Sequence, residues 1–235
     1  MCGRFALTVN LNKAQEILPG LTADNEIREA FRPRYNIAPS QPVLTILNDA
    51  RKELRFTSWG LIPHWAKDTA IGKKMINARA ETLSDKPSFR TPFRKNRCLI
   101  VADGFYEWKK ESSKAKTPYF IRMKNRQPFA FAGLWDRWVN KEDERDIILS
   151  STIITTEPNQ LVAGIHNRMP VILHPDFYEL WLNPHEEPPD TLSTCLKPYN
   201  AFEMEAYRIS KAINSPANDS PDCIQSLDSE ILPFA

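Results

Sequence analysis

The chain alternates between short hydrophobic runs and polar, proline-containing turns, a pattern that predicts strands more often than helices. Residues 4–9 alternate loosely between apolar and polar and predict a short strand that anchors the N-terminus in a sheet. Runs rich in β-branched and aromatic residues predict the remaining strands, at residues 43–47, 54–59, 98–102, 119–123, 129–138, 147–156, 171–173 and 205–209.

Helices are expected to be few and short. Asn10 or Asn12 is predicted to cap a helix that ends at Leu18. The other predictions are helical turns at residues 158–163 and 175–182, an irregular helix with a basic face between residues 83 and 97, and a polar surface loop at residues 183–190.

These elements predict an α+β fold: one strand-dominated domain with twisted, barrel-like antiparallel or mixed sheets and short flanking helices. No internal repeat, low-complexity block or long linker is visible. The domain is therefore expected to span residues 1–235, with an irregular tail from about residue 211. With 235 residues, of which 42% are hydrophobic, the chain is long enough to bury a substantial core.

The formal net charge is only +2, so bulk electrostatics do not indicate a nucleic-acid binder. An anionic partner would have to be held by a local basic patch. No apolar run approaches the ~20 residues of a membrane span, and the N-terminus lacks the apolar core of a signal peptide. A cytoplasmic protein, or a nuclear one in a eukaryote, is expected, with no membrane partner.

The four cysteines and four histidines are scattered along the chain, which favours reduced thiols over a disulfide framework. Neither a Cys-x-x-Cys nor a His-x-x-x-His spacing occurs, so no metal site built from local motifs is expected. No cofactor is expected either.

Cys2 offers unusual chemistry if Met1 is removed, because its α-amine then lies beside its thiol. The amine can condense with an aldehyde to an imine, and the thiol can close a five-membered thiazolidine ring. An α-amino group titrates near ~7.7–8.0, so part of it is unprotonated at neutral pH. A retained Met1 would block this chemistry. The alternative interpretation is a frayed first residue with no role.

Polar residues stand out at the ends of several predicted core elements. Asn77 and Arg79 would share one face of an extended segment. Glu107 lies among aromatic residues, a setting that can raise the pKa of a carboxylic acid toward a general-acid role. His166 follows a Gly-Ile pair. The alternatives are a turn former for Asn77, surface charges for Arg79 and Glu107, and a structural histidine for His166.

Six ordered motifs resemble the SRAP (SOS-response-associated peptidase) family, whose members act on abasic sites in single-stranded DNA. They are residues 1–5 (MCGRF), 34–39 (RYNIAP), 59–63 (WGLIP), 76–82 (INARAET), 102–108 (ADGFYEW) and 165–170 (IHNRMP). The resemblance extends from residue 1 to about residue 210. Residues 213–214 depart from it, with Ile-Asn where many relatives have Val-Gly or Val-Asn.

The resemblance implies a catalytic set of Cys2, Asn77, Glu107 and His166. Glu107 would protonate the ring oxygen of the deoxyribose and open it, and the Cys2 amine and thiol would form the thiazolidine. His166 would shuttle protons. Asn77 would position Cys2 and the opened sugar.

The resemblance also implies a nucleic-acid-binding set. Arg4, Arg79 and Arg168 would hold flanking phosphates. Aromatic side chains would stack on bases or wedge a duplex apart, although core packing is expected for at least one of them. The set is completed by Pro39, Trp65, Phe105, Tyr106, Trp108 and Thr155.

The implied function is a stable protein–DNA cross-link that shields an abasic site during DNA repair and the SOS response. The implied activity is a single-turnover cross-linking reaction with a lyase-like or peptidase-like classification. A monomer bound to single-stranded DNA is expected, associated with the nucleoid in bacteria. The alternatives are a cysteine-type (auto)peptidase and a passive single-stranded DNA-binding protein, which the Cys2→Ala variant would distinguish.

Overall fold

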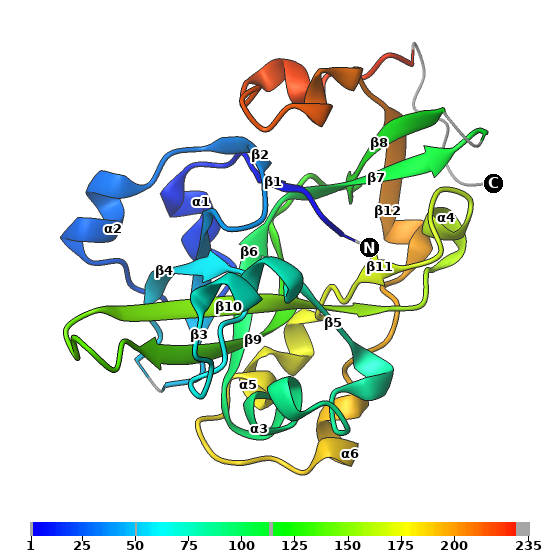
Figure 1. Cartoon of the computed structure of the whole chain (residues 1–235). Helices are drawn as coiled ribbons and strands as arrows, with labels where there is room; N and C mark the ends of the chain where they lie inside the picture. Colours follow the sequence, from blue (N-terminus) through cyan, green and yellow to red (C-terminus); the bar gives the residue numbers. More distant parts are fainter. Residues whose placement is uncertain (1, 50, 113–114, 229–235) are drawn as a thin grey trace.

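Two β-sheets connected by short helices make up the fold, and the predicted strand-dominated α+β class is confirmed (Figure 1). The computed structural model describes residues 2–49, 51–112 and 115–228. The strands are β1 (Phe5–Leu7), β2 (Arg34–Ile37), β3 (Pro42–Leu47), β4 (Leu54–Trp59), β5 (Asn77–Arg79), β6 (Arg97–Ala102), β7 (Gly104–Lys110), β8 (Lys116–Met123), β9 (Phe129–Val139), β10 (Ile147–Thr156), β11 (Met169–Pro170) and β12 (Met204–Arg208).

The helices are short and lie outside the sheets. The α-helices are α1 (Leu11–Gln15), α2 (Asn25–Ala30), α3 (Pro87–Lys95), α4 (Gln160–Ala163), α5 (Tyr178–Trp181) and α6 (Pro189–Ser193). The 3-10 helices are η1 (Thr69–Lys74), η2 (Ala80–Thr82), η3 (Pro175–Phe177), η4 (Ala201–Glu203), η5 (Lys211–Asn214) and η6 (Pro221–Ile224).

The larger sheet closes on itself. Within the described residues, the strand pairings run β10-β4-β3-β6-β9 and return from β9 to β10, so five strands form a ring. The β10–β4 pair is parallel and the other pairs of the ring are antiparallel. Beyond the ring, the C-terminal half of β10 pairs with β5 in parallel and with β11 in antiparallel orientation. Closure leaves few unpaired edges in the ring, and β10 carries two extra strands toward the second sheet.

The second sheet has the strand order β12-β8-β7-β1-β2. Its central strand β7 pairs with β1 through Phe5↔Phe105, which places the first residues of the chain next to residues 104–107. In Figure 1 the blue β1 runs from the N-terminus into the second sheet, between β7 and β2. Strand pairing fixes the N-terminal segment, as the alternating pattern of residues 4–9 predicted.

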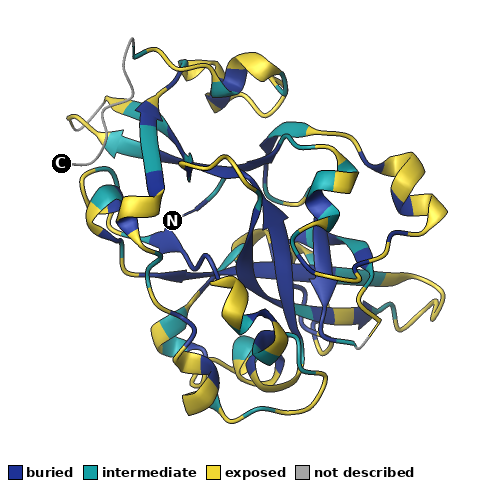
Figure 2. Ribbon diagram, turned by 180° about the vertical axis from the view of Figure 1, so that it is seen from behind, coloured by how far each residue is buried: buried dark blue, intermediate teal, exposed yellow. Residues whose placement is uncertain are grey.

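Aromatic side chains join the two sheets in the core. Phe5 packs edge-to-face on Trp59 and on Phe131, with ring centroids 5.1 and 5.6 Å apart, respectively. Both partners lie on the ring, whereas Phe5 lies on the second sheet, and all three are fully buried. Figure 2 shows the strands buried and most helices exposed. Burial of β1 against the ring holds the segment before it in place.

The guanidinium of Arg97 is fully buried at the start of β6. It donates hydrogen bonds to the carbonyl oxygens of Trp181 (2.9 Å), Asn183 (2.6 Å), His185 (3.1 Å) and Phe93 (3.3 Å), and to that of Arg94. These carbonyls belong to α3, to the end of α5 and to the loop after it. Arg97 thus attaches two peripheral segments to the ring.

The predicted strands are confirmed, with shifts of a few residues, except at residues 171–173. There the strand ends at Pro170, and Ile172 forms an isolated bridge with Phe131. Several observed elements were not predicted. α2 has a mostly polar sequence in which only Ile27 is buried, and Asp24 caps it. β7 was not assigned as a strand, and α6 begins within the predicted surface loop.

The predicted irregular tail contains η5 and η6 and no strand or α-helix up to residue 228, where the description ends. Its backbone is nevertheless anchored, because Asn36 Nδ2 donates to the carbonyl oxygens of Ser215 (3.0 Å) and Asn218 (2.6 Å). Residues 229–235 of the predicted tail lie outside the described residues. None of the described helices combines the length and apolarity that crossing a membrane requires.

Candidate functional site

Cys2 and Asn77 lie 75 positions apart in the sequence and are brought together by the fold. Asn77 Nδ2 donates a 2.8 Å hydrogen bond to the backbone oxygen of Cys2. Asn77 begins β5, which pairs with β10 opposite Ile153. Its Oδ1 is buried and has no hydrogen-bond partner among the described residues. Asn77 therefore fixes the Cys2 backbone and leaves one acceptor directed into the site.

Glu107 and His166 form the second half of the site. Glu107 Oε2 lies 3.8 Å from His166 Nε2. Glu107 is on β7, two positions after Phe105, which pairs with Phe5 of β1. The charge of Glu107 also acts on the thiol of Cys2. The four residues of the predicted catalytic set thus gather around the N-terminal segment.

Burial sets the protonation states of these groups. It raises the pKa of Glu107 to about 7, so that the protonated acid and the carboxylate are both populated near neutral pH. Burial lowers the pKa of His166, so its imidazole is mostly neutral. Burial, followed by the charge of Glu107, raises the pKa of the Cys2 thiol well above its ordinary range. The site therefore holds a neutral thiol beside a carboxylic acid that can donate a proton.

The ring of His166 lies between the backbone of Arg168 and the carboxyl group of Glu107. The backbone N–H of Arg168 lies 3.1 Å from His166 Nδ1, and the Arg168 carbonyl oxygen lies 3.3 Å from the same nitrogen. On the other side of the ring, Nε2 lies 3.8 Å from Glu107 Oε2. These contacts direct the Nε2 edge of the imidazole toward Glu107.

The three predicted phosphate-binding arginines differ in their surroundings. Arg79 is exposed at the end of β5. Arg168 forms a bidentate pair with Glu81, with Nη1–Oε1 and Nη2–Oε2 distances of 2.6 and 3.0 Å. Arg4 is half-buried and donates from Nη1 to Asn36 Oδ1 (2.5 Å) and to the Ile213 carbonyl (2.8 Å). Of these three, Arg79 has the most accessible guanidinium.

The prediction that Phe105 and Tyr106 stack on bases is corrected by the structure. Both side chains have no exposed surface, because β7 is a central strand that is covered on both faces. Phe105 packs edge-to-face on Phe131, and Tyr106 packs on Phe120. This is the core packing that was expected for at least one of the aromatic residues.

The remaining residues of the predicted DNA-binding set vary in exposure. Trp65 is 49% exposed, so part of its ring is accessible at the surface. Trp108 and Pro39 are partly exposed, and Trp108 Nε1 donates to Asn214 Oδ1 at 2.8 Å. Thr155 is buried, and its carbonyl oxygen accepts a 2.7 Å hydrogen bond from Arg168 Nη2. Its side chain is therefore not at the surface.

Glu81 belongs to the site but was not singled out from the sequence. It lies two residues after Arg79 in the motif that also contains Asn77. An acidic residue in a basic motif is a signal for an ion pair, although its partner, 87 positions away, could not be identified without the fold.

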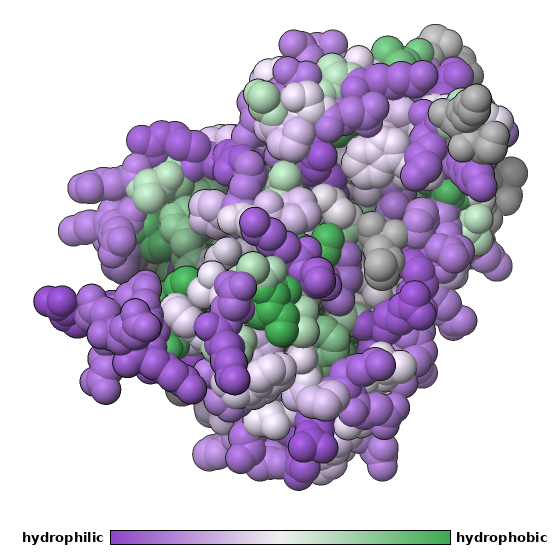
Figure 3. All heavy atoms as spheres, viewed as in Figure 1, coloured by the Kyte–Doolittle hydropathy of each residue, from purple (hydrophilic) through white to green (hydrophobic). Residues whose placement is uncertain are grey.

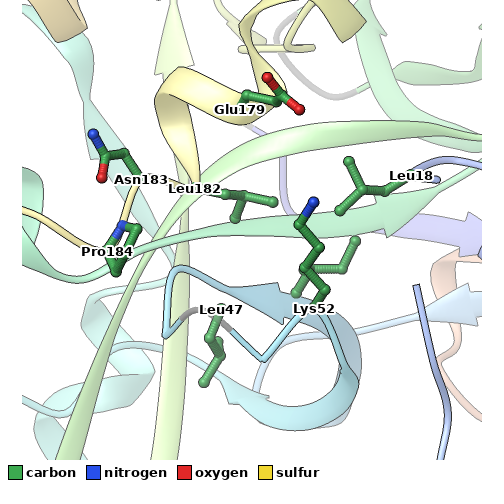
Figure 4. Close-up of a pocket in the computed structure, with 8 residues that line it drawn as sticks. Leu18, Leu47, Lys52, Glu179, Leu182, Asn183 and Pro184 are labelled. Atoms are coloured by element: carbon green, nitrogen blue, oxygen red, sulfur yellow. The ribbon is translucent and has the colours of Figure 1, made fainter. Parts of the chain in front are cut away.

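Other hollows of the surface lie away from this site. Hydrophilic residues predominate on the face shown in Figure 3, and hydrophobic ones gather in hollows. One groove of about 310 Å³ is lined by leucines of three segments, with Lys52 and Glu179 among its polar lining residues (Figure 4). None of the predicted site residues lines it. Among the described residues, no group of three or more His, Cys, Asp or Glu side chains could hold a metal ion.

Comparisons with known proteins cover nearly the whole chain. The model of the SOS response associated peptidase (SRAP) family matches residues 1–216. The chain is 50% identical over 228 residues to the abasic site processing protein YoqW of Bacillus subtilis, covering 96% of this chain and 100% of that protein. It is 30% identical over 233 residues to the abasic site processing protein YedK of Escherichia coli, covering 96% and 99%. A crystal structure of a protein from Bacteroides thetaiotaomicron superimposes with a TM-score of 0.86 at 31% identity, covering 96% and 99%.

Proposed function

The chain belongs to the SOS response associated peptidase family, and from this premise we propose that it processes abasic sites in single-stranded DNA by linking them covalently to Cys2. The observation that supports this most is the gathering of Asn77, Glu107 and His166 around the N-terminal segment. The names of its relatives YoqW and YedK agree with abasic sites as the target.

The reaction begins with the closed hemiacetal of the abasic deoxyribose. Protonated Glu107 gives its proton to the ring oxygen, the bond between C1 and that oxygen breaks, and the C1 hydroxyl loses its proton to water, so that C1 becomes an aldehyde. The Cys2 α-amine, exposed by loss of Met1, then attacks C1 and water leaves, which gives an imine. His166 moves protons during this exchange. Finally the thiol sulfur bonds to C1, and its proton passes to the nitrogen, which closes the thiazolidine.

The protonation states of the site suit this order of steps. A carboxylic acid with a pKa of about 7 can donate its proton near neutral pH and take it back afterward. The raised pKa of the Cys2 thiol disfavours early attack by sulfur, so the amine is the first nucleophile. Asn77 Oδ1 is available to accept a hydrogen bond from the amine or from the opened sugar.

DNA binding is proposed to depend on a few accessible groups. Arg79 would contact a flanking phosphate, and Trp65 would stack on a neighbouring base. Phosphate contacts position the strand without reading its sequence, which suits a protein that recognises a lesion.

The peptidase alternative receives less support from the site. Cysteine peptidases need a thiolate, which a lowered thiol pKa provides, whereas burial raises the pKa of Cys2. His166 also directs its Nε2 toward Glu107. We therefore favour cross-linking through the amine over peptide hydrolysis.

The proposal is tested by mass spectrometry of the intact protein after incubation with a single-stranded oligonucleotide that contains one abasic site. The expected result is a protein that has lost Met1 and gained the mass of the oligonucleotide less one water, since imine formation releases one water and ring closure none. An oligonucleotide with a normal base at the same position is the control. If protein lacking Met1 gains no mass with the abasic strand, the proposed function is wrong.

Glu107→Gln should slow cross-linking by about 100-fold, in the range that a general acid contributes. For the wild type, the rate should fall as the pH rises through about 7, because the proton-donating form of Glu107 is present only below its pKa. The variant cannot titrate at this position and should lack that fall. Single-turnover rates between pH 5.5 and 9 measure both effects, and an unchanged pH profile in the variant would show that another group is the acid.

A further inference from the structure

We propose that Glu81 is a positioning residue, which holds Asn77 and His166 at their spacing around Cys2 through its ion pair with Arg168. The proposal rests on the function proposed above, because it assigns to Glu81 and Arg168 a role in the same reaction.

The contacts of Arg168 occupy most of its donors. Nη1 and Nη2 each donate to one oxygen of Glu81, and Nη2 also donates to the Thr155 carbonyl at 2.7 Å. The remaining Nε is buried and lacks a partner among the described residues. The Arg168 side chain is only 15% exposed, whereas that of Glu81 is 52% exposed. These contacts hold the guanidinium in one position against Glu81 and Thr155.

The ion pair bridges two strands across a third. Thr155 of β10 pairs with Arg79 of β5 on one side and with Pro170 of β11 on the other. Glu81 lies in η2, two residues after the end of β5, and Arg168 directly precedes β11. The guanidinium therefore crosses β10 at Thr155 and joins the segment after β5 to the segment before β11.

Each of these segments carries one group of the site. Asn77 begins β5, four residues before Glu81, and holds the Cys2 carbonyl. His166 lies two residues before Arg168, whose backbone N–H donates to His166 Nδ1 at 3.1 Å. The same arginine thus fixes the imidazole through its backbone and the position of β5 through its side chain.

We expect the Glu81–Arg168 ion pair to contribute to the geometry of the site more than to the stability of the fold. An ion pair with one partner half-exposed adds little to the free energy of folding. The hydrogen bond from Arg168 lowers the pKa of Glu81, so the carboxylate stays charged and paired at neutral pH. A displacement of about 1 Å in a reacting group can nevertheless lower the reaction rate about 100-fold. The ion pair would prevent such a displacement of Asn77 and His166.

The test compares Glu81→Gln with the wild type, using single-turnover cross-linking to abasic single-stranded DNA at saturating DNA. The amide keeps the shape of the side chain but presents an NH2 group to the guanidinium, which breaks the bidentate pair. We expect the maximal rate to fall by about tenfold or more, while the Kd for the same strand, measured with a reduced, non-reactive abasic analogue, changes by less than about twofold. Glu186→Gln is the matched control, because Glu186 pairs with Arg94 and Lys95 on the surface, in contact with none of the site residues.

Two further variants separate positioning from other roles. If Glu81 acts through His166, adding Glu81→Gln to His166→Ala should slow the reaction less than it does alone, since coupled residues are not additive. Arg168→Lys keeps the charge but loses the planar fork, so it should slow the reaction as Glu81→Gln does. Should Glu81→Gln not fold, Arg168→Lys decides the question by the same comparison of rate and Kd.

Several results would overturn the proposal. An unchanged rate in Glu81→Gln, a tighter Kd from unmasking a phosphate-binding Arg168, or an additive loss with His166→Ala would each exclude the positioning role. Failure of the proposed function is a separate outcome, because in that case the wild-type protein itself would form no adduct.

Discussion

Cys2→Ser should abolish the heat-stable adduct with abasic DNA but leave an imine that borohydride can trap. Serine keeps the α-amine after loss of Met1, so the imine still forms. Its hydroxyl closes a far less stable five-membered ring than the thiol does. Denaturing gel electrophoresis after heating, with and without borohydride, measures the two species separately. The heat-stable product is expected to disappear, the largest functional effect of any substitution considered for this chain.

The control is Cys195→Ser, which changes a buried cysteine at the end of α6, remote in sequence from the N-terminal segment. It should give the wild-type amount of heat-stable product. A residue retained ahead of Cys2 should abolish both species, because an amide nitrogen forms no imine. Cross-linking at the native rate by an N-terminally blocked protein would contradict the mechanism and would point to a lysine or a side-chain thiol.

Arg97→Met should destabilise the fold by about 3 kcal/mol or more, because it leaves the buried carbonyl oxygens of Trp181 and Phe93, and the part-buried one of Asn183, without this donor. Methionine replaces most of the volume of the arginine but none of its hydrogen bonds. For a domain of this size each kcal/mol lowers Tm by roughly 2–4 °C, so a fall of about 6 °C or more is expected. Thermal and urea unfolding followed by circular dichroism measure the change.

Arg94→Met is the matched control for Arg97. Arg94 lies three residues earlier, but its side chain is 53% exposed and pairs with Glu186 at the surface. Its replacement should change the free energy of unfolding by less than about 1 kcal/mol. Equal stabilities of the two variants would mean that the carbonyls around Arg97 are satisfied by water, and that the guanidinium does not hold α3 and the loop after α5.

The sequence predicted the central ring strands well because β6 and the first part of β9 are buried on both sides. β6 and the first part of β9 are almost continuous apolar runs, and such runs are hard to mistake. Elements that bury only a narrow face were not predicted from the sequence. In α2 a single isoleucine is buried, so no helical pattern of apolar residues is visible. In β7 the buried Glu107 interrupts the apolar run, and the strand was not recognised.

Residue chemistry and motif order together grouped Cys2, Asn77, Glu107 and His166 as candidates, and the structure places these four residues near one another. Which aromatic residues are exposed was not predictable, because burial depends on the position of a strand within its sheet. Phe105 and Tyr106 are buried since β7 lies at the centre of its sheet, whereas Trp65 lies on a loop. Long-range ion pairs such as Glu81–Arg168 leave no local pattern in the sequence. They can be recognised only when the fold is known.

The contacts that anchor residues 213–218 can form only late in synthesis, because these residues are translated long after the N-terminal segment. The ribosome produces residues 2–4 long before residues 213–218. Arg4 donates to the Ile213 carbonyl, and Asn36 donates to carbonyls of the same late segment. A nascent chain can therefore carry a free N-terminal cysteine long before Arg4 and Asn36 have these partners. These contacts with the start of the chain are completed only after residue 218 has been translated.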